Sequence, residues 1–479
     1  DGGMMLRTFK PPPEGPFTSA SNAGGLELVD WDNNIVWSYQ INTPTQLSHH
    51  DAVAMPNGHL LVLTWELVFT DELVALGRDP EEIAPQGFMW SERILELKPS
   101  GADGAEIVWE WQIKDHYVQQ FDATKAGYGI VADHPELFDI NLPDLNSPNS
   151  NASRDWNHFN AIDYHPQLDQ ILISTRNSDE IWILDHSTTT AEAAGHSGGM
   201  YGKGGDILYR WGNASAYDRA PVSEQKLFGQ HGAQWVDEGL SDEGRIILFN
   251  NGNGRPGPDF STVEIIAPPQ DSSGGYPVPA DAPFGPSAPH WVYGDEAGET
   301  FYSAYLSNAQ RLPNGNTLVN VGSPGTIFEI NQDRQVVWKY VIPLNGDFPG
   351  TQGQNISNNA AFRAYKYTAG SPQLSGQDLT PGSTIESGTD PADCMLSTGV
   401  ARVTEVAPRI MYIPGRHALN VRDIDVPDLH IVLLDLAGRQ VAAGKFVSGY
   451  LSLPAMADGI YVVSGTGLPL AQKILIVQR

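Results

Sequence analysis

Four histidines lie at matching places of an internal repeat in this 479-residue chain. In each copy, a histidine comes two or three residues before an alanine in a strand-like segment. The histidines are His49, His50, His158 and His231, and the alanines are Ala52, Ala161 and Ala233. A fourth copy has Ser307 before Ala309. Because equivalent positions of stacked repeats converge around the axis, we expect these histidines to meet.

An arginine joins this group through a predicted hairpin. The strand-like segment after His158 turns at His165 and returns to end at Arg176, so both residues would lie at one end of the hairpin. A permanently charged arginine binds two anionic oxygens, a neutral imidazole attacks an electrophile, and a second histidine accepts a hydroxyl proton. This combination suits the transfer of a tetrahedral oxyanion group. The candidate catalytic residues are His231, His158, Arg176, His50 and His49, and the candidate substrate-binding residues are Asn160, Asn251 and Arg255.

Other uses of these residues remain open at this point. A single histidine at a strand end often bonds only to a backbone carbonyl. A transition-metal site is disfavoured by the neighbouring arginine and by the absence of His-x-x-His or cysteine spacing. The acidic loop Asp30–Asn34 could hold a structural Ca²⁺, but it lacks the twelve-residue calcium-loop pattern and is typical of a β-turn. We therefore predict no organic cofactor and no catalytic metal.

Two phrases recur in five copies and predict the elements that position the site. The apolar-acid-apolar phrases are at 26–28, 95–97, 181–184, 263–265 and 328–330, and the Trp/Tyr phrases are at 36–39, 108–111, 208–211, 291–293 and 337–340. Short alternating strands at this period predict an all-β protein with a six-bladed β-propeller. We expect the sixth blade to be closed by residues 362–367 with N-terminal strands, and the Trp/Tyr phrases to be core between blades.

Composition shifts divide the chain into four parts. We predict an extended N-terminal segment at 1–23, the propeller at 24–370, a linker rich in Gly, Ser, Thr and Pro at 371–398, and a small β-sandwich at 399–479. The propeller's longest insertion, residues 113–157, is expected to help shape a binding mouth.

The charge excludes several classes of partner. Asp and Glu number 57 against 28 Lys and Arg, a net charge of −29, which argues against nucleic acid and anionic membranes. No apolar run reaches membrane-spanning length. The start at Asp1 suggests removal of a leader, and we expect export. The single cysteine, Cys394, permits no intramolecular disulfide.

Several ordered motifs resemble the bacterial arylsulfate sulfotransferase family. They lie at Ser48–Asp51, Trp156–Ala161, Ser174–Arg176, Gln230–Gln234 and Ala361–Tyr367. The resemblance implies an exported six-bladed propeller that moves a sulfuryl group from an aryl sulfate to a phenol by a ping-pong route, without a nucleotide sulfate donor. It implies that His231 carries the sulfuryl group, and that His158 and Arg176 hold its oxygens and assist proton transfer. The family's first histidine falls at His49 or His50, and we expect that residue to help the phenolate leave and to deprotonate the acceptor. The family's disulfide cannot form here.

The C-terminal residues are similar to the sorting domains of type IX secretion cargo, in Leu436–Arg439, Gly459–Val462 and Gln472–Val477. This implies an extracellular or cell-surface location, with the periplasm as the alternative, and leaves self-assembly or a homo-oligomer open. The competing function is a non-catalytic extracellular propeller that is adhesive or filament-forming. A polysaccharide- or sulfate-binding module is a third, weaker alternative.

Overall fold

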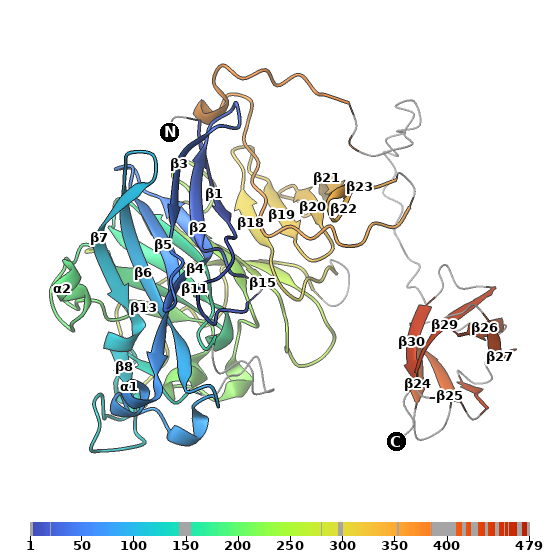
Figure 1. The fold of residues 1–479 in the computed structure, drawn as a ribbon, viewed down its shortest axis with the longest axis horizontal. Coiled ribbons are helices and arrows are strands. Elements are labelled where there is room, and N and C mark those ends of the chain that lie inside the picture. Colours follow the sequence, from blue (N-terminus) through green and yellow to red (C-terminus); the bar gives the residue numbers. More distant parts are fainter. Residues whose placement is uncertain are drawn as a thin grey trace. The chain divides into compact units, whose positions relative to one another are not determined.

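The chain forms two compact units, residues 1–389 and 390–479 (Figure 1). The computed structural model describes 3–385 except 20, 143–154, 279, 296–299, 352–353 and 384, then 409–413, 418–422, 430–435, 439–445 and 450–476 except 455, 458 and 467–471. Cys394, the second half of the predicted linker (386–398), Leu436–Gly438 and Val477 lie outside the described residues.

Antiparallel sheets whose strands pair in chain order build the first unit. The three-stranded sheet contains β1 (Met5–Phe9), β2 (Gly25–Val29) and β3 (Ile35–Gln40). The first four-stranded sheet contains β4 (Gln46–Ala54), β5 (Leu60–Phe69), β6 (Phe88–Ser100) and β7 (Gly104–Gln112). The second contains β10 (Phe159–His165), β11 (Gln170–Thr175), β12 (Glu180–Asp185) and β13 (Tyr209–Trp211). The third contains β14 (His231–Trp235), β15 (Ile246–Asn250), β16 (Thr262–Ile266) and β17 (Trp291–Tyr293). The fourth contains β18 (Asn308–Arg311), β19 (Thr317–Val321), β20 (Thr326–Ile330) and β21 (Val336–Val341).

The remaining elements of this unit are short. Two-residue strands form the pairs β8 (Tyr117–Val118) with β9 (Phe138–Asp139) and β22 (Leu344–Asn345) with β23 (Phe348–Pro349). The α-helices are α1 (Thr70–Ala75) and α2 (Thr190–Ala193). Single 3-10 turns lie at Pro80–Glu82, Ile113–His116, Val131–Asp133, Arg176–Ser178, Ala214–Tyr217, Val222–Glu224 and Pro372–Leu374. The all-β prediction is confirmed, and no helix in the described residues is long and apolar enough to cross a membrane.

Tight turns set the register between β4 and β5 and between β18 and β19. In the predicted Pro-Asn-Gly turns, Gly58 and Gly315 have φ of +84° and +83°, where a side chain would be strained. Met55 N–H donates to the His59 carbonyl, and Gly58 N–H donates back to the Met55 carbonyl. The hairpins predicted at these two places are therefore confirmed.

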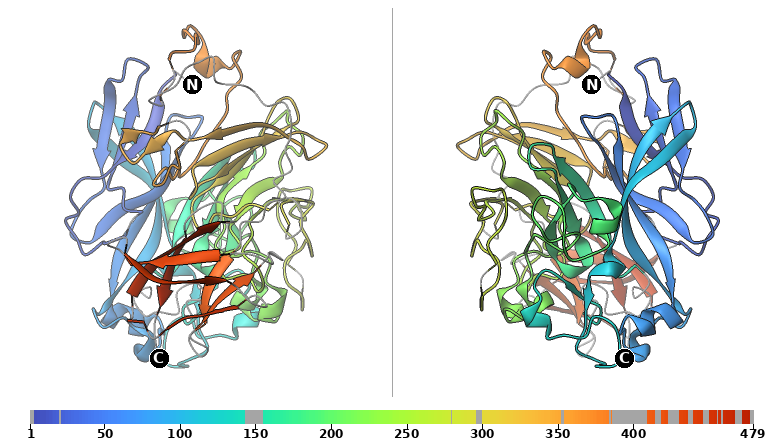
Figure 2. Two further views of the ribbon diagram at one scale, coloured as in Figure 1. Left: turned by 90° about the vertical axis from the view of Figure 1, so that its right-hand side faces the viewer. Right: turned by 90° about the vertical axis from the view of Figure 1, so that its left-hand side faces the viewer.

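The first strands of neighbouring sheets lie together inside the unit. β10 lies beside β4 on one side and β14 on the other, and β18 lies beside β14 and β15. Two further views show these sheets standing next to one another (Figure 2). Their inner ends therefore come close, as the predicted site requires.

The predicted aromatic core is confirmed in four sheets and wrong in the last. Trp37, Trp109, Trp211 and Tyr293 are buried, whereas Trp338 and Tyr340 are 43% and 38% exposed. Like β3, β7, β13 and β17, β21 is the outer strand of its sheet. The difference is cover, because α2 and the loop residues Thr188 and Gly205 lie over β7, whereas every residue of β21 is exposed in the described part of the chain.

The expected closing strand at 362–367 is not a strand in the structure. Side-chain amides bind it to β18 instead. The Asn308 Oδ1 and Nδ2 atoms bond to the backbone N–H and carbonyl of Ala364, and the Gln310 amide bonds to Lys366 in the same way. The N-terminal strand β1, for which the sequence indicated only an extended segment, pairs with β2, whose other edge pairs with β3.

The second unit contains two antiparallel sheets. One consists of β24 (Arg409–Ile413), β25 (Ala418–Arg422) and β28 (Tyr450–Ser452), and the other of β27 (Gln440–Lys445), β26 (His430–Leu434), β29 (Gly459–Thr466) and β30 (Gln472–Ile476). Leu419 of the first sheet shares a buried cluster with Ile431, Leu433 and Val463 of the second. A β-sandwich here remains a prediction.

Candidate active site

The histidine-bearing ends of β4, β10 and β14 are irregular. Their pairing registers shift between Ser48 and Ala52, between Phe159 and Ala161, and between His231 and Gln234. An extra residue in a strand bends it and changes the direction of its side chains. His50 and His158 also have left-handed backbones, with φ of 45° and 53°. Such strained residues gather at functional sites, so the local backbone itself marks these strand ends.

The structure brings the five predicted catalytic residues into one group. The rings of His50 and His158 lie with centroids 4.4 Å apart, and the Nδ1 atoms of His49 and His50 are 2.8 Å apart. His231 and Arg176 lie close enough to act electrostatically on His50, and Arg176 and His158 act on His231. The predicted convergence of residues up to 182 positions apart therefore holds, since His49 and His231 belong to the same group.

Hydrogen bonds fix which nitrogen of His231 carries the proton. The side-chain amide of Asn251 donates to the carbonyls of Ser303 (2.7 Å) and Leu306 (3.0 Å), so its Oδ1 is free to accept. That Oδ1 lies 2.8 Å from His231 Nδ1, which also lies 2.9 Å from the Gly229 carbonyl. Because both partners accept, Nδ1 carries the proton and Nε2 carries the lone pair. Within the described residues, no hydrogen bond engages Nε2.

The surroundings also keep His231 neutral. Burial lowers its pKa to about 3, and the positive charge of Arg176 contributes in the same direction. The bonds to Asn251 and Gly229 oppose this change but do not cancel it. At neutral pH the imidazole is therefore an uncharged nucleophile beside a fixed positive charge.

A buried carboxylate sets the protons of His49 and His50. Glu92 Oε1 accepts from Trp65 Nε1 (3.2 Å) and from Phe159 N–H (2.9 Å), and its Oε2 lies 2.9 Å from His49 Nε2. His49 Nε2 therefore donates, which leaves its Nδ1 to accept from His50 Nδ1. The chain of bonds ends at His50 Nε2, which keeps a lone pair.

The structure shows which of His49 and His50 faces the site, a choice that the sequence left open. His49 is 1% exposed, and its ring stacks on Trp65 at a centroid distance of 4.0 Å. His50 is partly exposed and faces the His158 ring. Desolvation lowers the pKa of His50 well below its ordinary value, and the neighbouring His158 adds to this. His50 faces the site, and His49 lies behind it.

His158 and Arg176 are held together by the backbone. The Arg176 N–H donates to the His158 carbonyl at 3.1 Å, as the predicted hairpin requires. His158 Nδ1 lies 2.6 Å from a carboxylate oxygen of Asp155, and Arg176 Nη1 donates to the side-chain oxygen of Asn177 at 2.9 Å. Arg176 also lies against Gly229, just before His231. A guanidinium therefore lies between the hairpin and the His231 strand.

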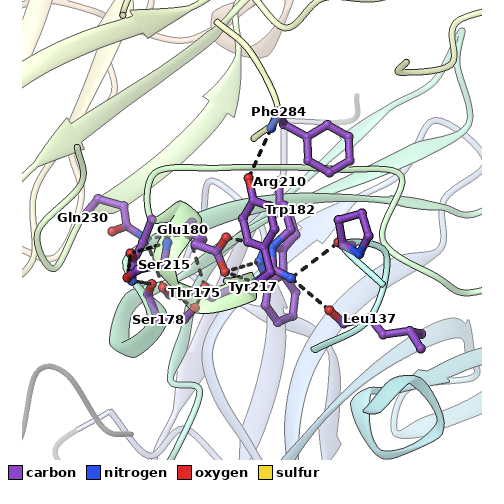
Figure 3. A network of polar contacts seen from close by, with 12 residues as sticks. Leu137, Thr175, Ser178, Glu180, Trp182, Arg210, Ser215, Tyr217, Gln230 and Phe284 are labelled. Carbon is purple, nitrogen blue, oxygen red and sulfur yellow. Dashed lines mark hydrogen bonds and ion pairs between the residues drawn. The ribbon is translucent and has the colours of Figure 1, made fainter. Parts of the chain in front are cut away.

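A buried polar network supports the strand end that carries His231 (Figure 3). Gln230 Nε2 donates to the carbonyls of Glu180 (2.6 Å) and Thr175 (3.2 Å). The Glu180 carboxylate accepts from Arg210 Nε at 2.8 Å, and both side chains are fully buried. Removing one partner of such a pair typically costs about 3–5 kcal/mol, so this network fixes the position of Gln230 and of the next residue, His231.

The three predicted substrate-binding residues have different surroundings. Asn160 is fully buried, and its Nδ2 donates to the Gln230 carbonyl at 2.7 Å. Asn251 lies behind His231 as its hydrogen-bond partner. Arg255 lies elsewhere, with its guanidinium 4.1 Å above the Phe260 ring in an open cavity of about 530 Å³ next to Glu264.

Sequence reasoning missed the carboxylates Glu92 and Asp155. Glu92 lies in the largely apolar segment Phe88–Leu97 but outside the repeated phrase at 95–97. That position is the signal by which it could have been found. The loop Asp30–Asn34, which the sequence favoured as a β-turn over a Ca²⁺ site, is a turn in which the Asp30 carboxylate accepts from Asp32 N–H and from the Asn34 N–H and Nδ2. In the described part of the chain, the His/Asp group able to hold a metal lies elsewhere, at His116, His196 and Asp206.

Comparisons with known proteins found one curated relative and several loosely similar structures. The curated arylsulfate sulfotransferase AssT of Lelliottia amnigena is 27% identical over 194 residues, which is 38% of this chain and 30% of that protein. The chain thus matches about a third of that relative's length. Solved structures overlap only loosely. A protein of unknown function from Bacteroides caccae has a TM-score of 0.35 at 11% identity over 67% of this chain and 75% of its own. Virginiamycin B lyase from Staphylococcus aureus has 0.28 at 10% identity over 71% and 89%.

The family assignment rests on a sequence match. The family model described as arylsulfotransferase (ASST) matches residues 5–342. This span covers well over half of the chain and includes His50, His158, Arg176 and His231. The protein therefore belongs to the arylsulfotransferase family.

Proposed function

We propose that the first unit transfers a sulfuryl group from an aryl sulfate ester to a phenol through a sulfohistidine at His231, without a nucleotide sulfate donor. One observation carries the proposal. His231 is a neutral imidazole whose Nδ1 proton is held by Asn251 and Gly229, whose Nε2 keeps a lone pair, and whose ring lies close enough to Arg176 to be affected by its charge. A nucleophile next to a fixed cation suits attack on an anionic sulfate ester.

In the first half-reaction, His231 Nε2 attacks the sulfur atom. The N–S bond forms as the bond from sulfur to the aryl oxygen breaks, and the aryl oxygen leaves with the electron pair as a phenolate. Arg176, with His158 beside it, stabilises the negative oxygens of the sulfuryl group during this transfer. Asp155, at 2.6 Å from Nδ1, positions the His158 ring.

In the second half-reaction, the acceptor phenol loses its proton to His50 Nε2 and its oxygen attacks the sulfur atom. The N–S bond breaks, and its electron pair returns to His231 Nε2. The new aryl sulfate leaves, and the proton on His50 passes to the departing phenolate of the next turnover. Glu92 and His49 act as positioning residues, because their bonds leave the lone pair of His50 on the atom that faces the site.

The proposal extends to the surroundings of this site. We place the four-stranded sheets in a six-bladed propeller whose first strands line the central channel, because β4, β10 and β14 lie side by side and bring the site residues together. An extracytoplasmic location and a sorting or anchoring role for the second unit are supported by the resemblance of residues 459–462 and 472–477 to sorting domains.

The test is release of a chromogenic phenol from its sulfate ester, with and without a second phenol as acceptor. Wild type should release at most one equivalent of the chromophore without acceptor and should turn over repeatedly only when acceptor is present in excess, and His231→Asn should lose both. His59→Asn is the control, because His59 is also hydrogen-bonded through Nδ1 but lies outside the site, beside Glu96. A folded wild type that is inactive on a panel of aryl sulfates would contradict the proposal and favour a non-catalytic propeller.

A further inference from the structure

A second histidine group lies apart from the candidate active site. His116 ends the 3-10 turn that follows β7, and His196 and Asp206 belong to the loop between α2 and β13. One ligand atom from each of the three residues lies within 4.8 Å of the other two. None of the three is among the groups that act on His50 or His231.

The hydrogen bonds of His116 leave a place for a cation. Its Nε2 lies 2.8 Å from the Ala193 carbonyl, which only accepts, so Nε2 carries a proton. Its Nδ1 lies 2.8 Å from Asp206 Oδ1, and His196 Nδ1 lies 2.7 Å from the same oxygen. A neutral His116 would place its Nδ1 lone pair against a carboxylate. Either a second proton or a metal ion must lie between them.

The residues around His116 hold its ring in the way that the neighbours of a metal-binding histidine commonly do. A metal-binding histidine commonly donates its other N–H to a backbone carbonyl, as His116 does to Ala193. The His116 ring stacks on Trp111 with an interplanar angle of 3°, and Trp111 Nε1 donates to the Gly205 carbonyl at 2.7 Å. A Cβ atom at Gly205 would come within 2.0 Å of the Ala193 carbonyl, so only glycine permits this close approach.

We propose that His116 Nδ1, His196 Nδ1 and the Asp206 carboxylate bind one divalent transition metal of the Zn²⁺ type. Zn–N and Zn–O bonds of about 2.0–2.2 Å in a tetrahedral site place ligand atoms roughly 3.3 Å apart, so each histidine Nδ1 needs to move away from Asp206 Oδ1 by only about half an ångström. The His196 side chain is 61% exposed and has room to move. Its exposure leaves the fourth position to water. The ion would join the end of β7 to the loop before β13.

The test measures zinc binding by the full chain without an affinity tag. Protein stripped with EDTA is dialysed against zinc chloride, and bound metal is counted in wild type and in His196→Ala. His290→Ala is the matched control, because His290 is also an exposed histidine near one aspartate, Asp242 at 3.4 Å. We expect wild type and His290→Ala to bind the same number of ions, and His196→Ala to lose one equivalent or to bind it about tenfold or more weakly.

Cobalt provides a second readout. Co²⁺ in place of zinc should give the visible absorption bands of a four-coordinate site in wild type, and these should disappear in Asp206→Asn. Zinc should also raise the unfolding temperature of wild type and not of His196→Ala. A wild type that binds no zinc, or a His196→Ala variant that binds as much as wild type, would overturn the proposal.

Discussion

At the scale of single residues, hydrogen-bond direction decides what each histidine can do. Asn251 uses both amide hydrogens on backbone carbonyls, so only its oxygen is left for His231. Glu92 accepts three donors, so His49 must donate to it. The result is two lone pairs, on His231 Nε2 and His50 Nε2, with separate roles in the proposed reaction.

Glu92→Gln should reverse the direction of the hydrogen bond between His49 and His50. The glutamine oxygen can still accept from Trp65 and Phe159, but its NH₂ group would face His49 Nε2. His49 would then donate from Nδ1 to His50, and His50 would lose the lone pair on Nε2. We expect the second half-reaction to slow about 100-fold or more while the first release of phenol persists. Rapid-quench kinetics would measure both steps.

The matched control for this variant is Glu96→Gln. Glu96 lies on the same strand and also bonds histidines, His59 and His186, but away from the site. It should leave both half-reactions near wild-type rates. If Glu92→Gln transferred to acceptor as fast as Glu96→Gln, the proposed role of His50 as base would be wrong.

The low pKa of His231 predicts loss of stability in acid. The pKa is about 3 in the folded protein and near 6.5 when unfolded, so protons bind the unfolded chain first. The contribution to stability is complete above about pH 6.5 and is lost as the pH falls toward 3. Wild type should lose about 2 kcal/mol more than His231→Asn between pH 7 and pH 5, at about 1.4 kcal/mol per pH unit.

Urea unfolding followed by tryptophan fluorescence measures this difference. All twelve tryptophans precede residue 389, so the signal reports the first unit alone. If wild type and His231→Asn lost the same free energy of unfolding between pH 7 and pH 5, His231 would not be held neutral by burial.

At the scale of elements, strand and turn chemistry was predictable from sequence, but the contacts of an element were not. The Pro-Asn-Gly hairpins follow from local preference alone. By contrast, Trp338 and Tyr340 belong to the same phrase as buried Trp109 and Trp111, and both pairs lie on the outer strand of a sheet. Only the pair on β7 is covered, by α2 and the loop next to it. The choice of His50 over His49 depends on a bulge, and Glu92 has no counterpart in the repeat, so neither could be read from periodicity.

The segment after Ala361 joins the two ends of the first unit through an ion pair rather than a strand. Arg363 donates to both carboxylate oxygens of buried Asp51, next to His50. Arg363→Met leaves that carboxylate with two backbone N–H donors but without a counter-ion, and we expect it to lower the free energy of unfolding by about 3 kcal/mol.

Arg7→Met is the control for this variant, since Arg7 pairs with Glu27 but is 40% exposed and should cost less than about 1 kcal/mol. Both values come from urea unfolding followed by tryptophan fluorescence. Equal effects of the two substitutions would argue against a stabilising role for the Asp51–Arg363 pair.

At the scale of the whole molecule, the residues of the proposed reaction all belong to the first unit. His50, His158, Arg176 and His231 precede residue 389, and so do their partners Glu92, Asp155 and Asn251. The sequence predicted a separate C-terminal β region because composition changes sharply near residue 371. It could not predict where the compact unit ends, since residues 372–374 still form a turn within it.

A chain ending at residue 389 should therefore keep the reaction. We expect its rate of transfer to phenol within about twofold of the full chain and an unchanged tryptophan unfolding transition, because the second unit has its own buried cluster. Steady-state assays and urea unfolding of both chains measure this. Loss of activity in a truncated chain that is still folded would mean that the second unit contributes to the site.

The covalent state of His231 tests the central claim most directly. Protein mixed with an aryl sulfate in the absence of acceptor is quenched under alkaline conditions, digested, and analysed by mass spectrometry. We predict the added mass of one SO₃ group on His231, its disappearance when phenol is added before quenching, and no such group in His231→Asn. Turnover of aryl sulfate with the sulfuryl group on another residue, or with no protein-bound sulfuryl group at all, would contradict the account.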